Sequence, residues 1–139
     1  MKIIAIDPGY ERMGVAILDK TSNKEVLLFS ECFRTSSKLP HEERLKLIGE
    51  EIEKLIKKYK PEAMAIETLF FKNNQKTAMR VSEARGVMLY VASKNGLLVK
   101  EFMPNEIKIA VTGYGASDKE QVIFMTKKLV KIDKEIKYD

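Results

Sequence analysis

The sequence contains a single cysteine, Cys32, and a single histidine, His41. One thiol cannot form an internal disulfide, so the chain suits a reducing compartment. One cysteine and one histidine also cannot supply the ligands of a zinc site. Any metal must therefore be bound by oxygen ligands, which favours magnesium or manganese.

Long apolar runs are missing as well. No segment approaches the roughly 18 apolar residues of a membrane span. The opening MKIIAIDPGY is too short and wrongly flanked for a signal peptide. We therefore expect a cytoplasmic protein with no membrane partner.

The chain has 139 residues and a net charge of +5. This length suits one domain, residues 1–139, and no linker or repeat divides it. Nucleic acid is the commonest partner of a basic domain, although charge can also serve solubility alone.

Apolar patterns and turn signals predict an α/β fold with a mixed five-stranded sheet flanked by helices. Three antiparallel strands come first, and a fourth strand after a long helix should run parallel through a right-handed crossover. We expect strands at 2–6, 13–18, 25–35, 63–66 and 97–102, and helices at 40–59, 74–94, 104–111 and from Ser117 to about 130. Ser117 and Glu120 are spaced as a capping box at the start of the last helix.

The helix expected at 74–94 is apolar on more than one side. One stripe joins Val81, Ala84, Met88 and Val91, whereas Met79, Gly86 and Tyr90 lie elsewhere. A helix of this kind is either deeply buried or shared with a partner subunit.

Asp7 and Glu67 each follow a short apolar run, at the expected carboxyl end of a buried strand. If these strands are parallel neighbours, both carboxylates emerge at one sheet edge, where ligands bind in α/β sheets. Adjacent carboxylates repel each other unless a proton or a cation lies between them. A pair of divalent ions about 4 Å apart could activate water there and cleave a phosphodiester. Taken singly, each acid could equally be a turn or surface residue.

Several segments resemble RuvC-type Holliday-junction resolvases. IAIDPGYERMG is similar to the first motif of that family, and AIETLFFKNN to the second. EARGVML and EFMPNEIKIAVTGYGASDKEQV resemble later segments, so the likeness covers nearly the whole chain in order. The resemblance implies an RNase H-like fold, a homodimer, and magnesium- or manganese-dependent paired nicking of four-way DNA junctions. It also implies products with a 5′-phosphate and a 3′-hydroxyl, and a branch-migration helicase as partner.

The resemblance further implies a site of four acids. Asp7 and Glu67 match the first two, and Asp139 falls where the third is expected. The fourth would lie on a final helix that this sequence does not include. We therefore expect that helix to be missing by truncation, and this exact chain to cleave poorly while still binding DNA.

Three DNA-contacting residues carry over from the resemblance. Phe70 matches an aromatic residue that stacks on an unpaired base near the junction centre, although a neighbour such as Phe71 could simply be core. Lys108 and Lys119 match basic residues required for junction processing. Lysines suit phosphate contacts and the charge that builds up in the transition state, and Lys119 is a candidate for the latter role.

Three alternatives remain. Asp7, Gly9 and Gly14 would also fit the phosphate loop of an actin-like ATPase, but that fold needs a second domain. The chain could be a non-catalytic junction-binding module, since the fourth acid is absent. It could also be a related RNase H-like nuclease acting on another nucleic acid.

Overall fold

The computed structural model describes residues 1–21, 24–69 and 74–132. Its core is a six-stranded mixed sheet in the order β5-β4-β1-β2-β3-β6. The strands are β1 (Lys2–Asp7), β2 (Arg12–Lys20), β3 (Glu25–Arg34), β4 (Ala63–Glu67), β5 (Leu98–Phe102) and β6 (Val130–Lys131). β1, β2 and β3 pair antiparallel, and β4 joins β1 in parallel, as the sequence predicts.

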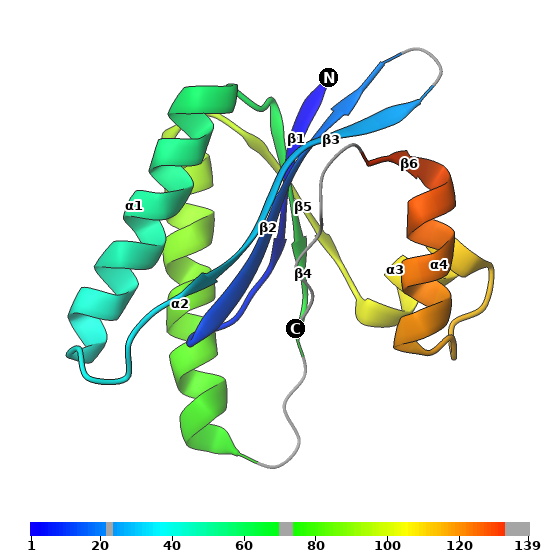
Figure 1. Cartoon of the computed structure of the whole chain (residues 1–139). Coiled ribbons are helices and arrows are strands. Elements are labelled where there is room, and N and C mark those ends of the chain that lie inside the picture. Colours follow the sequence, from blue (N-terminus) through cyan, green and yellow to red (C-terminus); the bar gives the residue numbers. More distant parts are fainter. Residues whose placement is uncertain (22–23, 70–73, 133–139) are drawn as a thin grey trace.

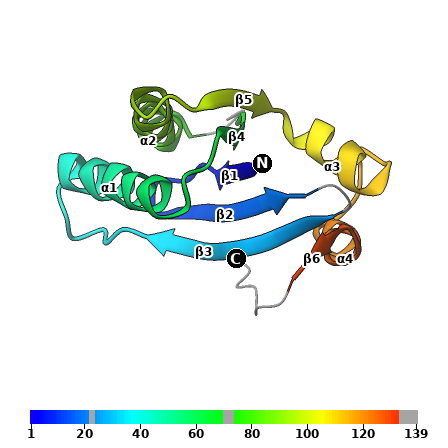
Figure 2. The ribbon, with the colours of Figure 1, turned by 90° about the horizontal axis from the view of Figure 1, so that it is seen from above.

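Four helices accompany the sheet: α1 (His41–Tyr59), α2 (Gln75–Lys94), α3 (Pro104–Thr112) and α4 (Lys119–Leu129). α1 and α2 run side by side over one face, while α3 and α4 lie on the opposite side (Figure 1). The view from above separates the two helix pairs across the sheet (Figure 2). No helix in the described parts of the chain is long and apolar enough to cross a bilayer.

The hydrophobic core lies between the sheet and the α1–α2 pair. Because side chains alternate along a strand, Ile4 and Ile6 of β1 face the helices together with Met64 and Ile66 of β4. Ile48, Ile52 and Leu55 of α1 and the predicted stripe of α2 meet them, with Ile48 fully buried. The odd-numbered residues of β1 and β4, which include Asp7 and Glu67, consequently face away from α1 and α2.

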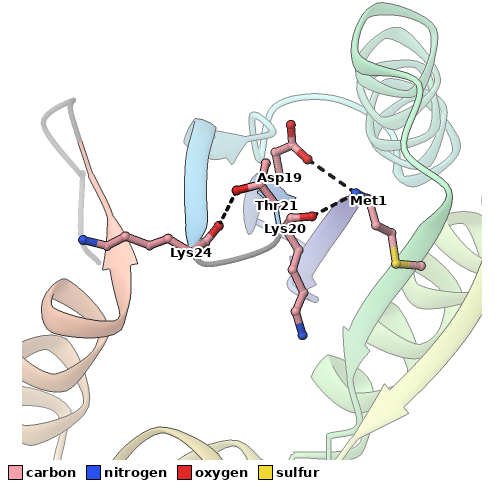
Figure 3. Close-up of polar contacts among 5 residues, drawn as sticks. All are labelled: Met1, Asp19, Lys20, Thr21 and Lys24. Carbon is pink, nitrogen blue, oxygen red and sulfur yellow. Dashed lines mark hydrogen bonds and ion pairs between the residues drawn. The ribbon is translucent and has the colours of Figure 1, made fainter.

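Polar contacts of Met1 join the start of β1 to the end of β2. The Met1 ammonium donates to the carbonyl oxygen of Lys20 at 3.0 Å and lies 3.6 Å from the Asp19 carboxylate (Figure 3). The Thr21 hydroxyl donates to the Lys24 carbonyl oxygen at 3.1 Å (Figure 3). The Met1 contacts fix β1 against β2 at the end opposite Asp7, and the Thr21 contact joins the end of β2 to the start of β3.

The structure departs from the predicted elements in two places. The sheet has a sixth strand, because the two residues of β6 after α4 pair with the start of β3. The cap of α4 is Asp118 and not Ser117: the Asp118 side chain accepts from the Gln121 N–H, and Gln121 completes the capping box. Ser117 is buried and hydrogen bonds within the preceding loop, because its hydroxyl meets Thr112 and the Tyr114 carbonyl.

Candidate active site

Asp7 and Glu67 are neighbours at one end of the sheet. β1 and β4 are parallel, and Ile6 pairs with Ile66 at the last position of the shared ladder. The next residue of each strand is therefore an acid, on the face that α1 and α2 do not cover. The sequence prediction that both carboxylates emerge at one edge is confirmed.

Small side chains form the floor beside the acids. Ala5, Gly14, Ala16 and Ala65 line a hollow that also contains Asp7 and Glu67. A Cβ built on Gly14 would lie 3.2 Å from the Asp7 Cβ, so a larger residue there would crowd the carboxylate. α3 contributes Ile107 to the hollow, which places this helix at its rim.

The turn after Asp7 requires glycine. A Cβ on Gly9 would lie only 1.7 Å from the Arg12 carbonyl oxygen, which no side chain could tolerate. The DPG sequence therefore allows β1 to turn back tightly into β2. This turn holds Asp7 at the strand end, opposite Gly14 in the ladder.

The electrostatics of the pair are unfavourable when both acids are ionised. Burial and the neighbouring charge of Asp7, together with a hydrogen bond between the two side chains, raise the pKa of Glu67 from 4.5 to about 7. The positive charge of Lys108, on α3, opposes this rise. Lys108 therefore lies close enough to act on the carboxylate pair electrostatically.

Arg85 is a positioning residue that the sequence reasoning did not identify. From α2 its Nε donates to the backbone oxygen of Glu67 at 3.3 Å, and its guanidinium forms an ion pair with Glu101 of β5. The Thr68 N–H donates to the Phe102 carbonyl oxygen at 2.8 Å, which extends the β4–β5 ladder past Glu67. Arg85 lies within the EARGVML segment, and its position in that motif was the available signal.

The other predicted residues lie elsewhere in the chain. Lys119 is the first residue of α4 and is exposed. Phe70 and Asp139 lie outside the described residues. Among the predicted site residues, Asp7 and Glu67 are thus neighbours, and Lys108 acts on Glu67.

The chemistry of the pair fits a hard divalent cation. Two adjacent carboxylates offer oxygen ligands, and a bound cation would remove the repulsion that raises the pKa of Glu67. Within the described residues no group of three or more Asp, Glu, His or Cys side chains converges. In this part of the chain, Asp7 and Glu67 are the two acids that could hold such an ion.

A mixed sheet in this strand order, with acids ending its first and fourth strands, defines an RNase H-like fold of metal-dependent nuclease type. The family model for the crossover junction endodeoxyribonuclease RuvC matches residues 3–139. The RuvC of Thermosipho melanesiensis is 48% identical over 134 residues, covering 96% of this chain and 85% of the relative. The chain therefore belongs to the RuvC family of crossover junction endodeoxyribonucleases.

Solved structures of Holliday junction resolvases share the fold of this chain. The structure of Thermus thermophilus RuvC in complex with a Holliday junction substrate superposes with a TM-score of 0.91 at 31% identity, covering 100% of this chain and 84% of that one. A yeast mitochondrial Holliday junction resolvase shares the fold, with a TM-score of 0.70 at 10% identity, covering 95% of this chain and 64% of that one.

Proposed function

We propose that this chain is a structure-specific endodeoxyribonuclease that resolves four-way (Holliday) DNA junctions by paired symmetric nicks, in recombination and repair. The observation that carries the proposal is the carboxylate pair of Asp7 and Glu67 at adjacent ends of parallel strands, with the raised pKa of Glu67. Membership of the RuvC family and the likeness to a junction-bound relative support the choice of substrate.

Asp7 and Glu67 would hold magnesium or manganese, as a pair of ions, with Asp139 as a further ligand. When bound, such ions lower the pKa of water and stabilise the departing 3′ oxygen of a phosphodiester. The protein's part is to hold both carboxylates in place, and the bound ions would favour the ionised form of each. The tight Gly9 turn serves Asp7, and the Arg85 contact serves Glu67.

Basic and aromatic residues complete the proposed site. Lys108 is near enough to influence Glu67, so it can neutralise phosphate charge at the reacting group. Lys119, exposed at the start of α4, would contact the backbone or the developing charge. Phe70 would stack on a base near the junction centre.

A homodimer through α2 would place a site on each of two DNA strands. Met79 and Tyr90 are 65% and 66% exposed, unusually much for large apolar residues. They lie in one stripe with Glu83 and Gly86, at alternating spacings of four and three residues. A Cβ on Gly86 would meet nothing within 4 Å, so a second helix could approach closely there.

Other parts of the proposal rest on the family resemblance. We propose that residues 1–139 act as one nuclease domain in the cytoplasm, where the DNA substrate lies. A branch-migration helicase would deliver the junction.

The test is cleavage of a synthetic four-way junction against a linear duplex containing the same sequences, using the chain extended by the final helix that the family resemblance implies. We expect cleavage of the junction alone, only with magnesium or manganese, and with products that ligase can reseal. Asp7→Asn should abolish cleavage but leave junction binding in calcium measurable.

The outcomes separate the alternatives. Equal cutting of junction and duplex would favour a related nuclease with another substrate. Junction binding without metal-dependent cleavage would favour a non-catalytic binding module. Normal cleavage by Asp7→Asn would refute the assignment of the metal site.

A further inference from the structure

A second cluster of charge lies at the same end of the molecule as the carboxylate pair. It surrounds a hollow between the loop that follows β3 and the first turns of α1 and α2. Every charged residue lining this hollow, apart from the histidine, is a cation, and hydroxyl groups lie among them. The lining residues are Tyr10, Ser37, Leu39, His41, Arg44, Lys76, Thr77 and Arg80.

Arg44 is fixed in place at the base of the hollow. Its side chain belongs to a residue only 8% exposed, and its Nε donates to the Thr35 hydroxyl at 3.0 Å while one Nη donates to the Thr35 carbonyl at 3.3 Å. Its guanidinium carbon lies 4.0 Å from the centre of the Tyr10 ring. A guanidinium has further N–H groups beyond those two, so Arg44 retains donors for an anion.

Two guanidinium groups lie near the Tyr10 ring. Arg80, from α2, is 5.9 Å from the centre of the ring that also contacts Arg44. The Tyr10 hydroxyl and His41 Nδ1 are 2.7 Å apart, and His41 Nε2 lies 3.2 Å from the Glu83 carboxylate. In a neutral imidazole that donates to Glu83, Nδ1 accepts from Tyr10, so this chain of bonds holds the ring steady.

The cations that line the hollow, Arg44, Lys76 and Arg80, form no ion pair within the part of the chain that the structure describes. The Glu83 carboxylate is engaged by His41. The side chain of α1's N-cap residue, Pro40, makes no capping hydrogen bond, so this helix end can also favour an anion.

A second hollow continues the cluster and shares Ser37 with the first. It is lined by Arg12 and Arg34, which pair directly across the β2–β3 ladder. Like charges opposite each other destabilise a sheet. An anion bound between these groups would remove that cost.

The cluster lies beside the catalytic acids in the chain and in space. Tyr10 follows Asp7 by three residues, in the turn that leaves β1. The first turns of α1 and α2 lie at the same end of the sheet as the ends of β1 and β4, and α3 with Lys108 lies on the other side (Figure 1). A DNA strand crossing the carboxylates could therefore place a flanking phosphate in this hollow.

We infer that the hollow between Arg44, Lys76 and Arg80 binds a backbone phosphate of the DNA arm beside the cleavage site, with Tyr10 as its positioning residue. This inference rests on the proposed DNA substrate. It adds an anchoring site that is separate from the metal-binding acids. The chemistry recognised is a phosphodiester anion, so the site reads position and carries no base specificity.

The test is the salt dependence of junction binding by Lys76→Gln/Arg80→Gln, measured by fluorescence anisotropy in calcium. The logarithm of the binding constant falls with the logarithm of the salt concentration, and each lost phosphate contact reduces the steepness of this fall by about 0.9. We expect the slope to fall by about 1 to 2 and affinity at low salt to drop roughly 10-fold or more, with the difference vanishing at high salt. Arg44 is left intact because it is buried and structural.

Lys57→Gln/Lys58→Gln is the matched control, since it removes the same charge from the exposed last turn of α1. It should leave the slope nearly unchanged. The melting temperature of the Lys76/Arg80 variant, and its rise with manganese, should equal those of the parent chain. An unchanged slope, or equal falls in both double variants, would overturn the phosphate site alone. Failure of the parent chain to bind any DNA would overturn this site and the proposed function together.

Discussion

Replacing Asp7 by asparagine should stabilise the metal-free protein at alkaline pH while abolishing its response to divalent ions. Burial and the Asp7 charge together raise the pKa of Glu67 from 4.5 to about 7. Above pH 7 the folded chain must therefore hold two ionised carboxylates side by side. Asparagine keeps the shape of Asp7 and removes the repulsion. A substitution that abolishes catalysis should therefore increase the free energy of unfolding.

The pH dependence follows from the sign of this change. Between pH 4.5 and about 7 the folded protein keeps a proton on Glu67 that the unfolded chain releases. The stability that this proton contributes is complete below pH 4.5 and is lost as pH rises through about 7. In Asp7→Asn the pKa of Glu67 should lie lower, so less stability is lost over the same range.

The size of the effect is modest. Converting the whole rise of the Glu67 pKa at about 1.4 kcal/mol per tenfold change would give roughly 3 kcal/mol. Much of the rise comes from burial, which the substitution leaves in place, and solvent screens a half-exposed carboxyl. About 1 kcal/mol is therefore recovered, or about 3 °C in melting temperature for a chain of this length.

The assay is thermal unfolding at pH 5 and pH 8, in EDTA and in manganese. Asp7→Asn should melt above the parent chain at pH 8 in EDTA and nearly with it at pH 5. Manganese should raise the melting temperature of the parent more at pH 8, because the ion must displace the Glu67 proton at lower pH. It should leave the variant unchanged.

Glu50→Gln is the control for removing one negative charge, since Glu50 is exposed on α1. Burial and the neighbouring Glu51 also raise the pKa of Glu31, so both proteins keep a common pH slope and only their difference matters. A variant that melts below the parent at pH 8 in EDTA would refute the repulsion. If manganese raised the melting temperature of Asp7→Asn as much as that of the parent, the shared cation site would be refuted.

Three further predictions concern the surroundings of the acids and α2. Gly14→Val should weaken manganese binding at least tenfold, measured by calorimetry, because its side chain would crowd Asp7; unchanged affinity would show that the floor has room. Arg85→Met should lower stability by about 1 kcal/mol in urea titrations, because the half-buried Glu67 carbonyl oxygen loses its charged donor and Glu101 loses its ion pair; an unaltered midpoint would contradict the anchoring role. Met79→Glu/Tyr90→Glu should convert a dimer into a monomer by light scattering, with each chain still folded, and a persistent dimer would exclude this stripe.

Local periodicity was sufficient to predict most of the fold. Strands and helices fell within about two residues of their expected ends, because apolar spacing and turn residues mark them. The meeting of Asp7 and Glu67 followed from topology alone: both residues end strands that a helical crossover must make parallel. The two-residue β6 could not be predicted, because its pairing depends on where α4 ends in space.

Contacts that depend on the rotation of a helix about its axis could not be predicted from the sequence either. The hydrogen bond from Arg85 to the Glu67 carbonyl oxygen, and the contacts of the Tyr10 ring with Arg44 and Arg80, depend on how α1 and α2 are turned against the sheet. The sequence shows these residues only as arginines on amphipathic helices and a tyrosine in a turn. Their partners lie far away in the sequence, so apolar spacing does not indicate these contacts, and the place of Arg85 within EARGVML was the available signal.

The two charge clusters have a common physical logic. At one end of the sheet, like-charged acids are held together at a cost, and beside them like-charged cations are held together at a cost. A nucleic-acid phosphate with its associated divalent cations offers both missing charges in one ligand. Binding of such a substrate would therefore relieve both clusters at once, and the stability withheld from the free protein would appear as affinity for the complex.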